Sequence, residues 1–167
     1  MKIVIAPDKF KGSLNSFEVC NAIEKGLLQA SASFNIIKLP MADGGDGLSD
    51  VIAYYTNARL QGAKVQDPLG RYIDAHWLLS FDGKTAFIEM AKASGLQLLR
   101  QNEYNPLLTS SYGTGQLIEA AIARGVQNII MGVGGSATND GGIGMAAALG
   151  YLFLDANGNH LQPIGKN

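Results

Sequence analysis

The segment KIVIAPDKFKGSLNSFEVCNAIEKGLL, residues 2–28, decides the fold because its periodicity changes within one short stretch. KIVIA (2–6) is an apolar run typical of a buried strand, and the PDKFKGSLN that follows is rich in turn residues. Asn15 is the expected N-cap of a helix, with Glu18 at the third helical position reaching back to it. Apolar residues then recur at helical spacing, at Phe17, Cys20, Ile23, Leu27 and Leu28. The segment therefore predicts a strand, a loop and a helix in that order.

The same order of elements follows once more along the chain. FNIIKLP (34–40) predicts a strand, MADGGDG (41–47) a loop, and residues 48–55 a helix. Two such units in tandem favour an α/β fold with a parallel sheet and right-handed crossover connections. Near Asn57 the pattern changes to alternation with period two, and turn signals such as Asp-Pro-Leu-Gly at 67–70 indicate antiparallel hairpins. We therefore expect a domain boundary at residue 57.

The last third of the chain returns to alternating helices and strands. SYGTGQLIEAAIARG (111–125) and IGMAAALG (143–150) predict helices that each end at a glycine, and VQNIIMGV (126–133) predicts a strand between them. YLFLD (151–155) predicts the start of a further strand. Because no complete unit follows it, we expect the rest of the first domain to lie beyond residue 167.

Composition narrows the class of partner. Lys and Arg number 13 against 14 Asp and Glu, and no run of like charge exceeds two residues, so we expect neither nucleic acid nor a membrane as partner. The single cysteine, Cys20, cannot form an internal disulfide. The first apolar run is too short for a signal peptide, and no run approaches the roughly 18 residues of a membrane span. These features predict a cytoplasmic protein that acts on small molecules.

Glycine is unusually frequent, at 21 of 167 residues. Four segments, 7–15, 41–47, 109–115 and 132–142, are expected where strands lead into helices, which is where open parallel sheets bind ligands. Helix N-termini attract anions, and glycine lets the backbone approach a ligand closely. The pattern predicts that substrate or phosphate is bound by Asp8, Gly44, Gly45, Ser111, Gly113, Thr114, Gly134, Gly135, Ser136, Thr138 and Asn139.

Carboxylates occur in three of these four segments, at Asp8, at Asp43 with Asp46, and at Asp140. An acid beside an anion-binding backbone is unfavourable unless a cation or a reacting hydroxyl lies between them, and Mg²⁺ bound by carboxylates and phosphates is a common solution. The pattern therefore favours phosphoryl transfer, with Asp43, Asp46 and Asp140 as catalytic candidates. Asp43 and Asp140 are the expected metal ligands. The alternative is that these acids only stabilise turns.

Basic residues of the first loop could neutralise phosphate charge. Lys11 is the preferred candidate and Lys9 the second, although a loop lysine is most often simply solvated. Glu89, at the end of a predicted strand, is expected to be a solvated residue, with a role as a site acid as the alternative. His76 and His160 lie in no triad or zinc-binding pattern, so surface or packing roles are expected.

A dinucleotide site is a competing interpretation of residues 132–142. Gly132, Gly134 and Ala137 match the pattern G-x-G-x-x-A, and Asp155 lies near the distance of a ribose-binding acid. However, the helix of a dinucleotide fold normally continues directly from this motif, whereas Asn139-Asp140-Gly141-Gly142 interrupts helix formation here.

Five blocks together resemble the class I glycerate kinases: IAPDKFKGSLNSFEVCNAIEKG, PMADGGDG, IEMAKASGLQLL, NPLLTSSYGTGQLI and GVGGSATNDGGIGMAAALG. They follow the family order from residue 1 to about residue 158, and since family members are longer, the chain resembles an N-terminal portion. The resemblance implies two α/β domains with the active site between them. Residues 1–57 would begin a Rossmann-like parallel-sheet domain, and residues 58–167 would begin a second α/β domain with a mixed sheet.

The resemblance also implies an activity. Glycerate kinases of this class transfer phosphate from ATP to D-glycerate, giving 2- or 3-phosphoglycerate. ATP, Mg²⁺ and D-glycerate are thus the expected ligands, and a homodimer is possible. The loop 136–140 would bind an anionic group, and the loop 43–47 would hold metal or activate the hydroxyl. The family usually has Ser at Lys9 and Glu at Asp46. A nicotinamide-dependent oxidoreductase and a non-catalytic module that binds small anions remain as alternatives.

Overall fold

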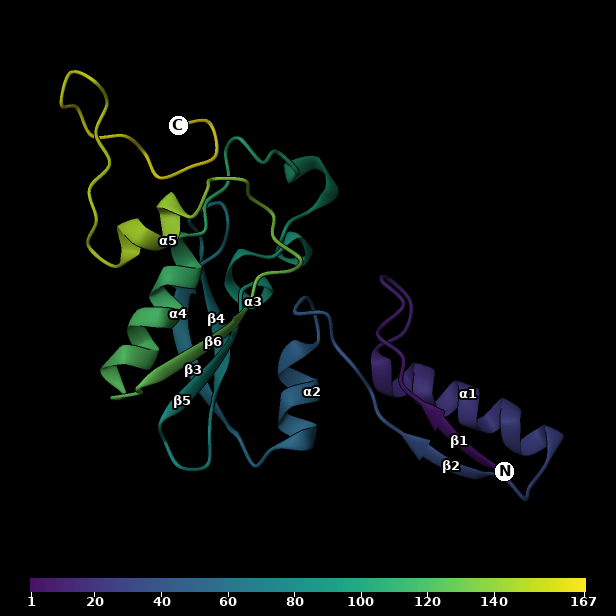
Figure 1. Cartoon of the computed structure of the whole chain (residues 1–167). Helices are drawn as coiled ribbons and strands as arrows, with labels where there is room; N and C mark the ends of the chain where they lie inside the picture. Colours follow the sequence, from purple (N-terminus) through teal and green to yellow (C-terminus); the bar gives the residue numbers. More distant parts are fainter.

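The computed structural model describes residues 1–167, and its first unit is a small parallel sheet covered by one helix. Strand β1 (Lys2–Ile5) pairs in parallel with β2 (Asn35–Lys38), and helix α1 (Ser16–Ala30) connects them. The helix begins as predicted: the Asn15 side chain accepts a hydrogen bond from the Glu18 amide, and the Glu18 carboxylate accepts one from the Asn15 amide. In Figure 1 this unit stands apart from the rest of the chain.

The second sheet has four strands in the order β3-β4-β5-β6. Strands β3 (Arg59–Gln66), β4 (Tyr72–Leu79) and β5 (Thr85–Glu89) are antiparallel neighbours, and β6 (Asn128–Gly132) pairs in parallel with β5. The sheet is therefore mixed. An α/β fold with one parallel sheet and a second, mixed sheet is confirmed.

Helices cover both faces of the mixed sheet (Figure 1). On one face, α2 (Leu48–Tyr55) packs against β4 and β5; on the other, α4 (Tyr112–Ala123) contacts β3, β4 and β5 and is joined by α5 (Ile143–Ala148). The short helix α3 (Ala91–Ser94) follows β5, and two 3₁₀ turns, η1 (Leu96–Leu98) and η2 (Gln101–Glu103), follow α3. The bounds of α2 agree with the expected helix at 48–55.

The main core lies between the mixed sheet and α4. It consists of Val65, Ala75, Trp77, Ala86, Ile88, Ala93, Leu117, Ile118 and Ala121. Successive residues of a strand point to opposite faces, so Ala86 and Ile88 of β5 face this core while Glu89 faces α2. Burying a large apolar side chain stabilises a fold by about 1.5–3 kcal/mol, so this layer holds the second unit together.

One predicted element is wrong. YLFLD (151–155) does not form a strand, because Leu154 makes only an isolated bridge to His160 and no other strand lies beside it. The Asp155 carboxylate instead accepts the amides of Asn157 and Asn159 and so stabilises a turn. An apolar run is a strand only where a neighbouring strand can satisfy its backbone groups.

Several expectations stay predictions. The domain boundary at residue 57 is one of them. Helix α2 precedes this boundary in the sequence but packs on the second sheet. The cytoplasmic location and the homodimer also stay predictions. No helix here combines the length and the apolar character needed to cross a membrane.

Candidate functional site

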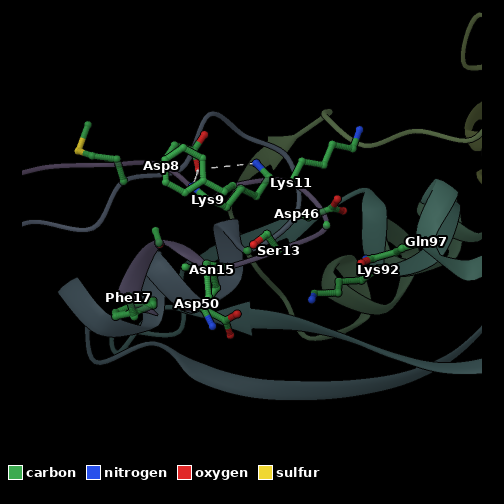
Figure 2. A pocket seen from close by; sticks show the side chains of 16 residues that line it. Asp8, Lys9, Lys11, Ser13, Asn15, Phe17, Asp46, Asp50, Lys92 and Gln97 are labelled. Carbon is green, nitrogen blue, oxygen red and sulfur yellow. Dashed lines mark hydrogen bonds and ion pairs between the residues drawn. The ribbon is translucent and has the colours of Figure 1, made fainter. Parts of the chain in front are cut away.

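A polar pocket of about 330 Å³ lies where three segments meet. The segments are the loop before α1 with the first turn of that helix, the loop leading into α2 with the first turn of that helix, and the α3–η1 region. Figure 2 shows Lys92 and Gln97 facing Asp8, Lys9 and Asn15 from the opposite side of the pocket. The lining residues are Asp8, Lys9, Phe10, Lys11, Gly12, Ser13, Leu14, Asn15, Ser16, Phe17, Met41, Asp46, Gly47, Asp50, Lys92 and Gln97.

Lys9 is the best-anchored cation of the pocket. Its Nζ donates to Asp43 Oδ1 at 3.0 Å and lies 3.7 Å from Asp8 Oδ1. Burial lowers the pKa of Lys9. The hydrogen bond to Asp43 and the charges of Asp8, Asp43 and Asp46 together raise this pKa by more than burial lowers it, so the net shift is upward. Sequence alone ranks Lys9 second. The preferred Lys11 also lines the pocket, but its side chain makes no ion pair.

Asp43 lies at the edge of this cluster. Its Oδ1 accepts both the Lys9 ammonium and, at 2.9 Å, the Gly45 amide. The hydrogen bond from Lys9, then that from Gly45 and the Lys9 charge, lower the pKa of Asp43. The side chain is 67% exposed and is not part of the pocket lining. Asp43 therefore holds Lys9, and one of its oxygens is already used in doing so.

Asp46 differs from every other acid of the chain. Its Oδ1 is the one buried side-chain oxygen or nitrogen without a hydrogen-bond partner. Leaving a buried polar atom without a partner is costly, and in folded proteins such an atom commonly binds an ion, a water molecule or a ligand. Gly135 lies against the same carboxylate, since a β-carbon there would be 2.8 Å from Oδ1. Asp46 thus lines a pocket that also contains lysines, while its Oδ1 lies buried against Gly135 without a partner.

Glu89 lies in a different environment from the one the sequence predicts. The sequence predicts a solvated residue, whereas Glu89 is 0% exposed. Its Oε1 accepts the Gly47 amide at 3.1 Å and its Oε2 the Ser49 amide at 2.9 Å, while Lys92 Nζ lies 3.6 Å from Oε1. The one available signal was its position at the end of an apolar strand, between Ile88 and Met90.

The two glycine-rich loops pack against each other. The Gly134 amide donates to the Gly44 carbonyl at 3.0 Å, and a β-carbon on Gly134 would lie 2.6 Å from the Gly45 Cα. The structure thus brings together Gly44, Gly45 and Gly134, three of the residues predicted to bind an anion. Their bare backbones allow close approach of the two loops, which fixes the segment that carries Asp46.

A second polar cluster contains most of the remaining candidates. Asp140 Oδ2 accepts the amides of Ser111 and Gly144 at 2.7 and 3.1 Å and the Ser111 hydroxyl at 2.8 Å, and Oδ1 accepts the Gly142 amide at 3.0 Å. Asp140 therefore caps the beginnings of both α4 and α5. It is 7% exposed and does not line the pocket.

The neighbours of Asp140 are also satisfied internally. The Thr114 and Ser94 hydroxyls share a hydrogen bond of 2.7 Å, and Thr138 donates to the Thr109 carbonyl at 2.9 Å. Gly113 packs directly on the Gln66 carbonyl. Ser136 accepts the Thr138 amide, and Asn139 is exposed. None of the candidates of 111–114 and 136–140 lines the pocket, and Ser111 and Thr138 are bonded to Asp140.

The dinucleotide interpretation gains no support. Asp155 bonds to its own turn, and the side chain of Asn159 also donates to it. Gly132 and Gly134, which would approach a pyrophosphate, instead contact the loop at 44–45.

The structure contains no group of three or more His, Cys, Asp or Glu side chains arranged to hold a metal ion.

Comparisons with known proteins agree on one family. A family model described as "Glycerate kinase family" matches residues 3–167 of the chain. The chain is 51% identical over 161 residues to the glycerate 2-kinase of Escherichia coli strain K12, covering 96% of this chain and 42% of that protein. It is also 51% identical to a glycerate kinase of Haemophilus influenzae, covering 99% of this chain and 43% of the relative.

A solved structure gives the same result. A crystal structure named for glycerate kinase 2 of Salmonella typhimurium LT2 superposes with a TM-score of 0.73 at 49% identity, covering 96% of this chain and 43% of that one. The chain thus spans less than half the length of these relatives. The match over residues 3–167 shows that the chain belongs to the glycerate kinase family.

Proposed function

We propose that the whole protein transfers the γ-phosphoryl group of ATP to a hydroxyl of D-glycerate. The family membership supports this proposal, and so does a pocket that combines carboxylates with three lysines. The relative from Escherichia coli is named a glycerate 2-kinase, which favours 2-phosphoglycerate over 3-phosphoglycerate as the product.

The observation that carries the proposal is the Asp46 carboxylate, which lines the pocket and whose buried Oδ1 accepts no hydrogen bond from the protein. Phosphoryl transfer to an alcohol needs an acceptor for the hydroxyl proton while the alcohol oxygen attacks the γ-phosphorus and ADP leaves. The Asp46 carboxylate takes this proton in the proposed reaction. Lys9, Lys11 and Lys92 line the same pocket and neutralise the charge of phosphate or of the glycerate carboxylate.

Magnesium fits the donor set of the pocket. Mg²⁺ takes one or two protein carboxylates together with substrate phosphates, and Asp8 and Asp50 line the pocket beside Asp46. We propose Asp8 and Asp50 for this role ahead of Asp43 and Asp140, neither of which lines the pocket. Magnesium would supply charge neutralisation for the phosphates.

A coupled ADP-release assay on the whole protein, with D-glycerate and MgATP, tests the proposal. We expect glycerate-dependent ADP release, with ³¹P NMR showing 2-phosphoglycerate. Equal activity in excess EDTA would reject the magnesium role. Binding of phosphate without turnover would support the non-catalytic module, and reduction of NAD by glycerate would support the oxidoreductase.

A further inference from the structure

Glu89 connects two parts of the pocket wall without lining the pocket itself. It ends β5, and it reaches across to the first turn of α2. The next turn of chain carries Lys92, which does line the pocket and whose side chain is 23% exposed. A fully buried carboxylate with no contact to solvent is therefore bonded to the segments that present Asp46 and Lys92.

Both oxygens of Glu89 act as acceptors. Each of its two oxygens accepts a backbone amide, so neither donates a proton to a protein acceptor, and the ammonium of Lys92 lies on the same side as Oε1. Burying a carboxylate is unfavourable unless such donors and an opposite charge compensate it. The arrangement suits a carboxylate with two accepting oxygens, whereas a glutamine would place an NH₂ group against one of the two amide donors.

Helix α2 depends on this carboxylate for its first turn. Its N-cap is Gly47, which has no side chain to accept the free amides there. Glu89 supplies the missing acceptor, because its Oε2 accepts the amide of Ser49, 40 residues away along the chain. Gly47 directly follows Asp46, so the hydrogen bond from the Gly47 amide also limits where the Asp46 carboxylate can point.

We propose that Glu89 is a positioning residue for phosphoryl transfer, which sets Asp46 and Lys92 in one arrangement across the pocket. This inference rests on the proposed function. Glu89 touches neither substrate in this proposal and acts only through the α2 amides and the Lys92 ammonium. Its removal should therefore lower kcat more than it raises KM, since the alignment of a base and a cation matters most in the transition state.

The test compares Glu89→Gln, Glu89→Asp and the control Glu103→Gln in the whole protein. Glu103 also holds a cation, Arg71, at 2.7 Å, but outside the pocket. In Glu89→Gln the side-chain NH₂ faces an amide donor, and we expect kcat to fall about 10- to 100-fold, the equivalent of one or two charge-assisted hydrogen bonds. KM for glycerate should change less than about threefold. Glu89→Asp keeps the charge and should retain more kcat, and Glu103→Gln should match the wild type.

Amide hydrogen exchange gives a readout that does not depend on catalysis. We expect Glu89→Gln to speed exchange at Gly47 and Ser49 selectively, with the core strands unchanged. Unchanged exchange at both amides, or an unchanged kcat, would reject the role of Glu89. A kcat that is normal once corrected for the folded fraction would also reject it. A wild-type protein without glycerate-dependent ADP release would instead reject the proposed function, while the exchange data would still decide whether Glu89 holds the loop.

Discussion

Asp46 and Asp140 occupy equivalent positions in the sequence but opposite surroundings in the structure. Each is the last acid of a glycine-rich loop that leads into a helix. Asp140 accepts four hydrogen bonds from the protein, whereas Asp46 Oδ1 has no partner. The difference lies in the number of internal donors, which decides whether a carboxylate stabilises the fold or is available to a ligand. Both are aspartates that precede a helix within three residues, so residue type does not separate the two cases.

The largest effect should come from Asp46→Asn. An amide keeps the size of the side chain but cannot accept a proton, so turnover should fall about 10²- to 10⁴-fold. Stability should change little, since no hydrogen bond to Oδ1 is lost. Steady-state ADP release and thermal unfolding measure the two quantities. Wild-type turnover in this variant would remove the distinction between the two acids.

Asp140→Asn should give the opposite result. The new NH₂ group would face amide or hydroxyl donors that now bind Oδ2 or Oδ1. We expect the free energy of unfolding to fall by about 2–3 kcal/mol, while kcat per folded molecule is kept. Urea unfolding and an assay corrected for the folded fraction provide the comparison. A large loss of kcat with unchanged stability would restore Asp140 as a catalytic candidate.

Gly135→Ala should affect both properties to a smaller extent. Gly135 has a φ of +75°, and a β-carbon there would lie 2.8 Å from Asp46 Oδ1. The strained backbone should cost about 1–2 kcal/mol of stability, and displacement of Asp46 should lower kcat.

Gly83→Ala is the matched control for this variant. Gly83 has a φ of +73° in a hairpin turn, with no atom within 4 Å of an added β-carbon. It should lose similar stability but keep wild-type kcat. Equal kcat in the two variants would show that the contact with Asp46 has no catalytic consequence.

Local patterns predicted most of the fold. The Asn15 cap, the parallel pair β1–β2, and the bounds of α2 follow from periodicity and turn residues within a few positions. The predicted strand at 151–155 failed because its formation depends on a neighbouring strand, which apolar residues such as Leu152 cannot report. Sequence periodicity describes what a segment can bury, and pairing decides whether it does so.

The site was only partly predictable. Asp8, Lys9, Lys11 and Asp46 were candidates and line the pocket. The pairing of Glu89 with the α2 amides joins positions 40 or more residues apart, and no local pattern encodes it. Anion binding by Gly44, Gly45 and Gly134 stays a prediction, and in the structure their bare backbones let two loops meet. Glycine shows that something approaches the backbone closely, but the sequence does not say which segment of the chain it is.

The smallest effect concerns Asp43, an exposed acid whose partner is the Lys9 ammonium. The hydrogen bond from Lys9, together with the Gly45 amide, lowers the pKa of Asp43, so the folded state favours the ionised form. The stabilisation is therefore present above the ordinary pKa of about 3.9 and is lost as the pH falls through the lowered value. Wild type and Asp43→Asn should differ in free energy of unfolding by less than about 1 kcal/mol at pH 6, and the difference should shrink toward pH 3 and in high salt. Urea titrations at both pH values measure it. A difference that stays constant with pH would mean that Asp43 contributes through its turn hydrogen bond to Gly45 rather than through its charge.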